Sequence, residues 1–337
     1  MAPVIGYVGA DVPVELITAA GARPWRLAGH PGADQTAGDR YLGRGVDPAT
    51  RSLLSRLLDG EFGSLDGLVV SRDCESSARL FYALRELRRV DPAIALPPLH
   101  LVDVLHLPHR TTTRYVLAKI RQLRSALESW TGTLISDDAL AEAIEAHDRL
   151  RCLLADVAAL RRSGRLTGTT ALSIMADTTA LPVSRAIDRV AQLLDGDHPA
   201  VPGKRVFLTG SGHDGPHVYE ILEDAGLLIV GEDHDWGDLL WHRRVGAPTE
   251  LALAERYQHN GPSAPRASIR ARAAHTAAAA RACGAEALVS YVRDHDDAPA
   301  WDFPAQRAAT GLPSVLLDRQ PYGDLTDGAR TAIGELA

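Results

Sequence analysis

The chain has 337 residues, enough for about two domains of ordinary size, and its 45% hydrophobic and 23% charged residues are typical of a globular protein. Its formal net charge of −7 argues against a nucleic-acid-binding protein, which normally carries a basic face. Because the sequence has no run of 18 apolar residues and does not begin like a secretory signal, we expect a cytoplasmic protein that binds neither nucleic acid nor membranes.

The first 111 residues alternate between strand-like and helix-like segments. A helix is expected directly after the first strand, because Pro13 suits a first helical turn and Gly21 suits a left-handed cap. A polar loop is expected over residues 29–46. The predicted strands are residues 4–8, 24–27, 67–71 and 98–103, and the predicted helices are residues 14–20, 48–58 and 78–89. This alternation predicts an N-terminal α/β lobe over residues 1–111.

Residues 112–200 are predicted to be almost entirely helical, as a segment that links or caps two lobes. Val116, Ile120 and Leu123 recur at the spacing of one helix face, and Ser136 is a suitable N-cap for the next helix. The predicted helices are residues 114–130, 136–162, 169–175 and 181–193.

The α/β pattern returns in residues 201–337, the predicted C-terminal lobe. The predicted strands are residues 205–209, 226–231, 287–292 and 311–318, and the predicted helices are residues 217–225, 267–282 and 326–336. The sequence therefore predicts an α/β fold with two doubly wound parallel-sheet lobes, which look like a duplication of one plan, and a helical middle segment.

Polar loops follow the carboxyl ends of the predicted strands in both lobes. In a doubly wound sheet, ligands bind beyond these ends, where the strand order reverses. The loops are residues 9–12, 71–77, 210–216, 232–236 and 293–301. The predicted lining of a ligand cleft between the lobes is Gly9, Ala10, Asp11, Ser71, Arg72, Cys74, Gly210, Ser211, His213 and Asp233.

The three cysteines lie far apart without a CxxC spacing, which argues against a disulfide framework and a self-contained zinc site. Cys74 stands between a strand and a helix, where backbone N–H groups favour a thiolate, but it can equally be a semi-buried loop residue. Residues 210–216 could cradle a phosphate or carboxylate, or could simply form a turn. Histidines and aspartates gather in residues 213–297, either as a metal site or as solvated loops.

Several segments together carry a resemblance to a known family. The opening run of residues 5–27, with Pro-x-Glu-Leu-Ile before Ala-Ala-Gly, is joined in order by similar runs at residues 68–80, 132–144, 220–231 and 310–318. The chain resembles the 2-hydroxyacyl-CoA dehydratase and benzoyl-CoA reductase subunit family. In that family an ATP-driven activator passes an electron to an iron–sulfur cluster, and a ketyl radical forms from a CoA thioester.

The resemblance implies a [4Fe–4S] cluster in which Cys74 matches one ligand position. Gly9 stands where the family has a cysteine, and residues 43–47 and 293–301, which match the other ligand loops, contain no cysteine. Because Cys152 and Cys283 fall in or at the end of predicted helices, neither is expected to replace a missing thiolate. No cofactor is assigned to this chain, and a cluster is expected only through a partner subunit.

Two functional hypotheses follow. The first is that the chain is the cluster-poor half of a heterodimer and shapes the acyl-CoA site, where Arg23, Arg26, Arg72 and Arg79 could pair with phosphates or be ordinary surface arginines. The second is a repurposed stand-alone enzyme or small-ligand-binding protein that kept the two-lobe cleft without radical chemistry. Under the first, the expected partners are a related α/β subunit, a CoA-thioester ligand and an ATP-dependent activator; a homodimer is the other association considered.

Overall fold

The computed structural model describes residues 2–261 and 266–337 and divides into two compact units. Unit 1 comprises Met1–Arg151, Thr178–Ile187 and Arg243–Asn260, and unit 2 comprises Cys152–Asp177, Asp188–His242 and Gly261–Ala337. The long helix α6 (Asp137–Arg162) contributes its first part to unit 1 and its last part to unit 2. The three segments predicted from the sequence, with boundaries after residues 111 and 200, stay a prediction.

Unit 1 is built on a parallel four-stranded sheet in the order β2-β1-β3-β4. Its strands are β1 Val4–Val8, β2 Arg23–Arg26, β3 Gly67–Ser71 and β4 Leu99–Val102. The other elements of this unit are α1 Val14–Ala19, α2 Thr36–Leu42, α3 Pro48–Leu58, α4 Glu75–Val90, α5 Arg110–Thr131, the first part of α6, and α10 Glu250–Gln258.

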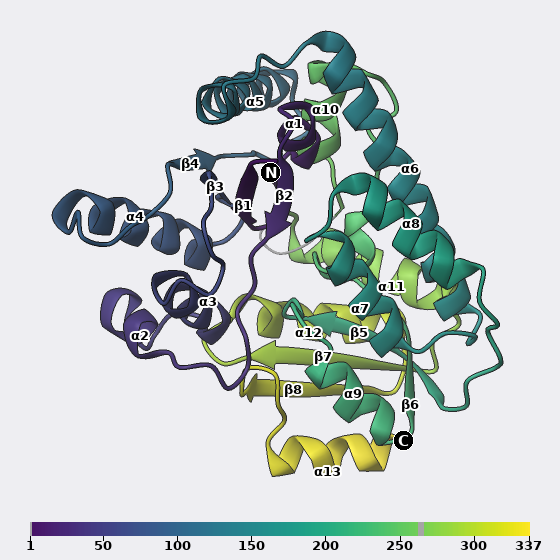
Figure 1. Ribbon diagram of the computed structural model, residues 1–337. Coiled ribbons are helices and arrows are strands. Elements are labelled where there is room, and N and C mark those ends of the chain that lie inside the picture. Colours follow the sequence, from purple (N-terminus) through teal and green to yellow (C-terminus); the bar gives the residue numbers. More distant parts are fainter. Residues whose placement is uncertain (1, 262–265) are drawn as a thin grey trace. The chain divides into compact units, whose positions relative to one another are not determined.

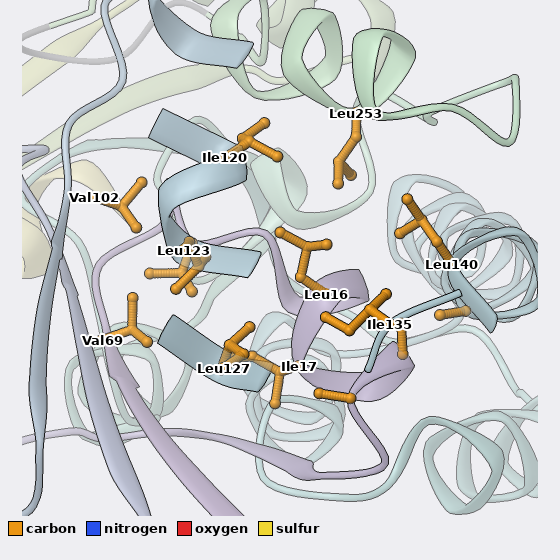
Figure 2. Close-up of a cluster of buried hydrophobic side chains, with 14 of the residues drawn as sticks. Leu16, Ile17, Val69, Val102, Ile120, Leu123, Leu127, Ile135, Leu140 and Leu253 are labelled. Atoms are coloured by element: carbon orange, nitrogen blue, oxygen red, sulfur yellow. The ribbon is translucent and has the colours of Figure 1, made fainter. Parts of the chain in front are cut away.

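The alternation of side chains along these strands gives the sheet two apolar faces. Val69 and Val102 pack with α1 and α5 on one face, and Figure 2 shows Leu16 and Ile17 of α1 turned toward the same cluster. Leu68 and Val70 belong to a second cluster with residues of α3 and α4. Both faces are therefore covered by helices, as a doubly wound sheet requires.

Unit 2 repeats the plan with a parallel sheet in the order β6-β5-β7-β8. Its strands are β5 Lys204–Gly210, β6 Leu227–Glu232, β7 Ala287–Arg293 and β8 Ser314–Gln320. Its helices are α7 Gly168–Thr178, α8 Val183–Leu194, α9 His217–Asp224, α11 Ile269–Ala282, α12 Ala298–Thr310 and α13 Asp327–Leu336, with a 3₁₀ turn at Asp238–Leu240; α7 ends and α8 begins with residues of unit 1. In Figure 1, α9 and α13 lie on one side of this sheet, and α11 and α12 on the other.

The shared strand order, in which the second strand lies outside the first, confirms the predicted fold class of two parallel-sheet lobes. Within each unit the order reverses at the first strand, so the carboxyl ends of β1 and β3, or of β5 and β7, leave the sheet as neighbours. Among the helices of the described residues, none is both long enough and apolar enough to cross a bilayer.

Two predicted loops are wrong in part, because one contains a helix and the other contains the start of a helix that was not predicted. The predicted loop at residues 29–46 contains α2, where a Cβ on Gly38 would stand only 2.2 Å from the carbonyl oxygen of Arg51. Close packing of α2 on α3 therefore requires this glycine in spite of its low helix propensity. The predicted loop at residues 293–301 ends early because α12 begins at Ala298, with Pro299 in its first turn, a position that proline favours.

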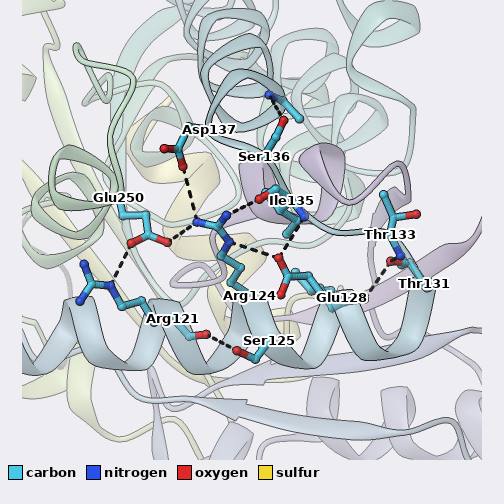
Figure 3. A network of polar contacts seen from close by, with 12 residues as sticks. Arg121, Arg124, Ser125, Glu128, Thr131, Thr133, Ile135, Ser136, Asp137 and Glu250 are labelled. Carbon is cyan, nitrogen blue, oxygen red and sulfur yellow. Dashed lines mark hydrogen bonds and ion pairs between the residues drawn. The ribbon is translucent and has the colours of Figure 1, made fainter.

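Helix α10 was not predicted, and it is held in unit 1 by a polar network with α5. Glu250 accepts hydrogen bonds from Arg121 Nε at 2.9 Å and from Arg124 Nη1 at 2.7 Å (Figure 3). On its apolar side, Leu253 is fully buried in the α1–α5 cluster. The helix is thus stabilised by partners more than 120 residues earlier in the chain.

Candidate functional site

The carboxyl edge of the unit 1 sheet forms a tight polar turn. Since β1 and β3 are paired, Gly9 follows one strand beside Ser71, the last residue of the other. Gly9 has φ +88°, and the backbone N–H of Ala10 donates a 2.8 Å hydrogen bond to Asp73 Oδ2. A Cβ on Gly9 would stand 2.0 Å from Ser71 Oγ and 2.4 Å from Asp73 Oδ2. There is no room for a side chain at residue 9.

Cys74 is the N-cap of α4. Its sulfur accepts a hydrogen bond from the backbone N–H of Ser77 at 3.4 Å and lies 3.1 Å from Ser77 Oγ. Although Cys74 is an exposed residue, desolvation of its sulfur and then the neighbouring Asp73 carboxylate raise the thiol pKa to about 12. This shift favours the neutral thiol and gives no support to the thiolate expected at this helix terminus.

These residues do not fit a [4Fe–4S] cluster. Such a cluster takes three or four thiolates, and Cys74 is the single cysteine at the strand ends of the described residues. Cys152 lies within α6, and Cys283 is buried at the end of α11. The turn at Gly9 is also closed by its own hydrogen bond and by the side chains of Ser71 and Asp73.

Asp11, one residue beyond this turn, is held in a bridge that the sequence did not predict. Its carboxylate is buried, and Oδ2 lies 2.9 Å from Nε2 of His106, which follows β4. The other ring nitrogen of His106 lies 3.1 Å from the carbonyl oxygen of Gln258, at the end of α10. The bridge holds the loop after β1 against the loop after β4. The signal in the sequence that could have indicated this contact was the presence of polar residues just beyond each strand.

Arg72 provides an exposed positive charge at the same edge. Its side chain is 58% exposed, and Nη1 lies 3.6 Å from Asp103 Oδ2. Asp103 is oriented by the hydroxyl of Tyr115, which donates a 2.7 Å hydrogen bond to the same oxygen. The guanidinium is therefore anchored on one side and accessible to an anionic ligand on the other.

In unit 2 the loops after β5 and β7 are joined through Ser211. Its hydroxyl donates a 2.6 Å hydrogen bond to Asp296 Oδ2 and accepts one of 2.9 Å from the backbone N–H of Arg293. Gly210, with φ +112°, allows this approach, because a Cβ there would stand 2.0 Å from the carbonyl oxygen of Tyr291. The glycine-rich loop is thus a close backbone contact between neighbouring strands.

His213 lies buried among aromatic rings in this loop. Its ring centroid is 4.8 Å from that of Tyr291, 5.2 Å from that of His234 and 5.3 Å from that of Tyr219. Burial, followed by the charges of His234 and Arg293, holds the pKa of His213 well below its usual value. His213 Nε2 has no hydrogen-bond partner among the described residues. The loop therefore contains a neutral imidazole.

Asp233, directly after β6, contacts α11 and the end of β5 through the hydroxyls of Thr276 and Thr209. It accepts a 2.6 Å hydrogen bond from the hydroxyl of Thr276, and burial raises its pKa to about 6. Within the described part of the chain, no group of three or more histidine, cysteine, aspartate or glutamate side chains could hold a metal ion. The polar loops of unit 2 thus give no support to the metal interpretation of their histidines and aspartates.

The predicted lining residues accordingly fall into two sets. Unit 1 holds Gly9, Ala10, Asp11, Ser71, Arg72 and Cys74 at its strand ends, and unit 2 holds Gly210, Ser211, His213 and Asp233 at its own. That all ten residues line one ligand cleft stays a prediction. The contacts add Asp73, His106, Arg293 and Asp296, which were not among the predicted residues.

A buried charged cluster surrounds Glu15 in α1, the helix that follows the loop after β1. Glu15 of α1 pairs with Arg151 of α6 and accepts a 2.9 Å hydrogen bond from the hydroxyl of Tyr257. His147 Nε2 lies 2.9 Å from the hydroxyl oxygen of Thr18 in the same cluster. Burial lowers the pKa of His147 to about 4. The cluster therefore holds a neutral histidine beside an ion pair.

We expect His147 to make unit 1 less stable in mild acid. Its pKa is about 4 in the folded protein and 6.5 in the unfolded chain, so between these values the unfolded chain binds a proton that the folded protein does not. The contribution is fully present above pH 6.5 and is lost as the pH falls toward 4. Relative to His147→Gln, the wild type should lose about 2 kcal/mol of unfolding free energy between pH 7 and pH 5, measured by urea denaturation.

Groups common to both proteins cancel in this comparison. Asp233, whose raised pKa gives an opposite pH dependence between 3.8 and about 6, is among them. Equal pH dependence of the wild type and His147→Gln over this range would contradict the assignment of a neutral buried His147.

Comparison with known proteins gives a consistent result along nearly the whole chain. A family model described as 2-hydroxyglutaryl-CoA dehydratase, D-component, matches residues 10–334. The (R)-phenyllactyl-CoA dehydratase beta subunit of Clostridium sporogenes is 22% identical over 98% of this chain and 89% of its own length. The (R)-2-hydroxyglutaryl-CoA dehydratase beta subunit of Acidaminococcus fermentans is 22% identical over 90% and 83%, and a benzoyl-CoA reductase subunit of Thauera aromatica is 26% identical over 68% and 61%.

Proposed function

Because the chain belongs to the 2-hydroxyglutaryl-CoA dehydratase D-component family, we propose that it is one subunit of a 2-hydroxyacyl-CoA dehydratase-like or acyl-CoA reductase-like enzyme. All three relatives are named as single subunits of such enzymes. The likeness extends over most of this chain, which favours a role for the whole chain in the same kind of assembly. The comparisons give no support to a stand-alone ligand-binding protein.

Within this assembly we propose that the chain shapes the acyl-CoA site while a related partner subunit holds the [4Fe–4S] cluster. The observation that carries this division of roles is the closed turn at Gly9, together with Cys74 as a lone neutral thiol. The exposed Arg72 guanidinium at the same edge suits a phosphate or carboxylate of the ligand. An ATP-dependent activator, which the resemblance implies, would act on the partner.

Anaerobic purification tests this proposal directly. The chain produced alone should contain less than one equivalent of [4Fe–4S], because its strand-end loops supply one thiol. Co-expressed with a related subunit encoded beside it, the chain should form a heterodimer that shows iron–sulfur absorbance and contains stoichiometric iron and sulfide. Iron analysis and light scattering of both preparations provide the measurement.

The co-encoded subunit expressed alone is the matched control, and it should account for the iron of the complex. Stoichiometric iron and sulfide in this chain alone would contradict the proposed division of roles. A chain that stays monomeric in the presence of its co-encoded relative would contradict the heterodimer.

A further inference from the structure

We infer that the Asp73 carboxylate fills the space and supplies the negative charge that a thiolate side chain at residue 9 would bring, so that Gly9→Cys alone does not create a thiolate ligand there. The inference deepens the proposed function and rests on it for its biological meaning. Its evidence is the geometry of the turn formed by Gly9, Ala10, Ser71 and Asp73.

The first step is steric. A Cβ on Gly9 would stand 2.0 Å from Ser71 Oγ, 2.4 Å from Asp73 Oδ2 and 2.8 Å from Asp73 Cγ. Real Cβ atoms do not approach other heavy atoms this closely, so both neighbours would have to move. Ser71 is fully buried at the end of a central strand, which limits its movement. Any side chain at residue 9 therefore requires the Ser71 and Asp73 side chains to move from their present positions.

The second step is electrostatic. A family cysteine at this place would bring an anionic sulfur to the strand end, and here Asp73 brings an anionic oxygen instead. The carboxylate accepts the N–H of Ala10 at 2.8 Å, so it satisfies a backbone donor that follows β1. With glycine at residue 9, the turn therefore has neither an empty space nor an unpaired Ala10 N–H at this position. The turn is complete without a cluster.

A stability comparison at two glycines tests the steric step. Gly43 is the matched control, because it has φ +83° against +88° for Gly9 and a Cβ on Gly43 would meet nothing within 4 Å. Both Gly→Ala variants bear the cost of positive φ, but only Gly9→Ala also meets Ser71 and Asp73. We expect thermal unfolding of Gly9→Ala about 5–10 °C below the wild type and at least about 3 °C below Gly43→Ala.

The same substitution in a Ser71→Ala/Asp73→Ala background tests whether these two side chains cause the clash. There, Gly9→Ala should cost no more than Gly43→Ala in the same background. Equal losses for Gly9→Ala and Gly43→Ala in the otherwise wild-type chain would overturn the inference, as would an undiminished loss for Gly9→Ala in the double-alanine background.

Two further measurements address the charge and the metal. Asp73→Ala should speed hydrogen exchange of the Ala10 amide about tenfold or more, because the N–H loses a charged acceptor. Gly9→Cys should bind Cd²⁺ no more tightly than the wild type, judged by ultraviolet sulfur-to-cadmium absorption. Unchanged Ala10 exchange, or tight Cd²⁺ binding by Gly9→Cys alone, would contradict the inference. Neither measurement needs a partner or substrate, so a failed heterodimer leaves the outcome intact.

Discussion

Replacing Arg161 by methionine is expected to lower the free energy of unfolding by about 4 kcal/mol, the largest effect of any single substitution considered. Arg161 of α6 is fully buried and pairs with the equally buried Glu232, and its Nη2 lies 2.8 Å from Asp238 Oδ2. Methionine fills much of the space but leaves two carboxylates without their cation. Removal of one partner from a buried ion pair typically costs about 3–5 kcal/mol.

The pH dependence of this variant adds a specific check. Burial raises the pKa of Asp238 to about 6 even though Arg161 opposes the shift. Without the arginine, protonation of Asp238 becomes still easier, and a neutral carboxylic acid tolerates burial better than a carboxylate. The loss of stability in Arg161→Met should therefore be smaller at pH 5 than at pH 8.

Urea denaturation of Arg161→Met and of an exposed control provides the measurement. Arg79→Met removes an ion pair with Glu75 in which both side chains are more than half exposed, so its cost should stay below about 1 kcal/mol. A loss of similar size in the two variants would show that Glu232 and Asp238 do not depend on Arg161.

The strands and most helices could be predicted because their signals are local. The strands at residues 4–8 and 67–71 coincide with β1 and β3, and the helix at residues 48–58 coincides with α3. These segments combine apolar runs with proline or glycine at their ends, and neither feature depends on distant residues. The parallel pairing of the strands in both sheets followed from their alternation with helices.

The helices that were not predicted are α2, α10 and α12, and the first two depend on partners outside their own segments. Helix α10 is positioned by Arg121 and Arg124, and α2 is positioned by contact of Gly38 with Arg51. No local sequence pattern shows these contacts. Because tertiary packing can override weak helix propensity, these helices could not be predicted from their own residues. The strand-end loops could be predicted as groups, but Asp73 could not be assigned to Ala10 without the register of β1 against β3.

The second large effect is expected at Glu15, whose replacement by glutamine should cost about 3 kcal/mol of unfolding free energy, because a buried arginine loses its closest carboxylate. Glu15 is fully buried, pairs with Arg151 and accepts a 2.9 Å hydrogen bond from the hydroxyl of Tyr257. Burial alone would raise its pKa, but the cations around it, Arg151 foremost, outweigh this and lower the pKa to about 2. Glutamine keeps the shape and removes the charge, which leaves Arg151 paired with the partly exposed Asp148.

The pH dependence of this variant has a definite sign. The folded pKa of Glu15 lies below its unfolded value of 4.5, so its contribution is fully present above pH 4.5 and is lost as the pH falls toward 2. Glu15→Gln has no carboxyl group at residue 15, so its stability has no pH-dependent contribution from that residue. The difference in stability between the wild type and Glu15→Gln should therefore be constant from pH 5 to pH 8 and should shrink below pH 4.5.

A double-mutant cycle with Tyr257→Phe tests whether the cluster joins α1 to α10. The phenol donates to Glu15 and accepts a 3.3 Å hydrogen bond from the N–H of Val14, the first residue of α1. If the two side chains act as one unit, the sum of the stability losses of the two single variants should exceed the loss of the double variant by about 1 kcal/mol. Strictly additive losses would mean that the Glu15–Tyr257 contact does not couple α1 to α10, and that α10 is held by its other contacts, among them its apolar face and the Glu250 ion pairs. Because α1 begins directly after the loop that carries Asp11, coupling in this cycle would also tie the position of that loop to α10.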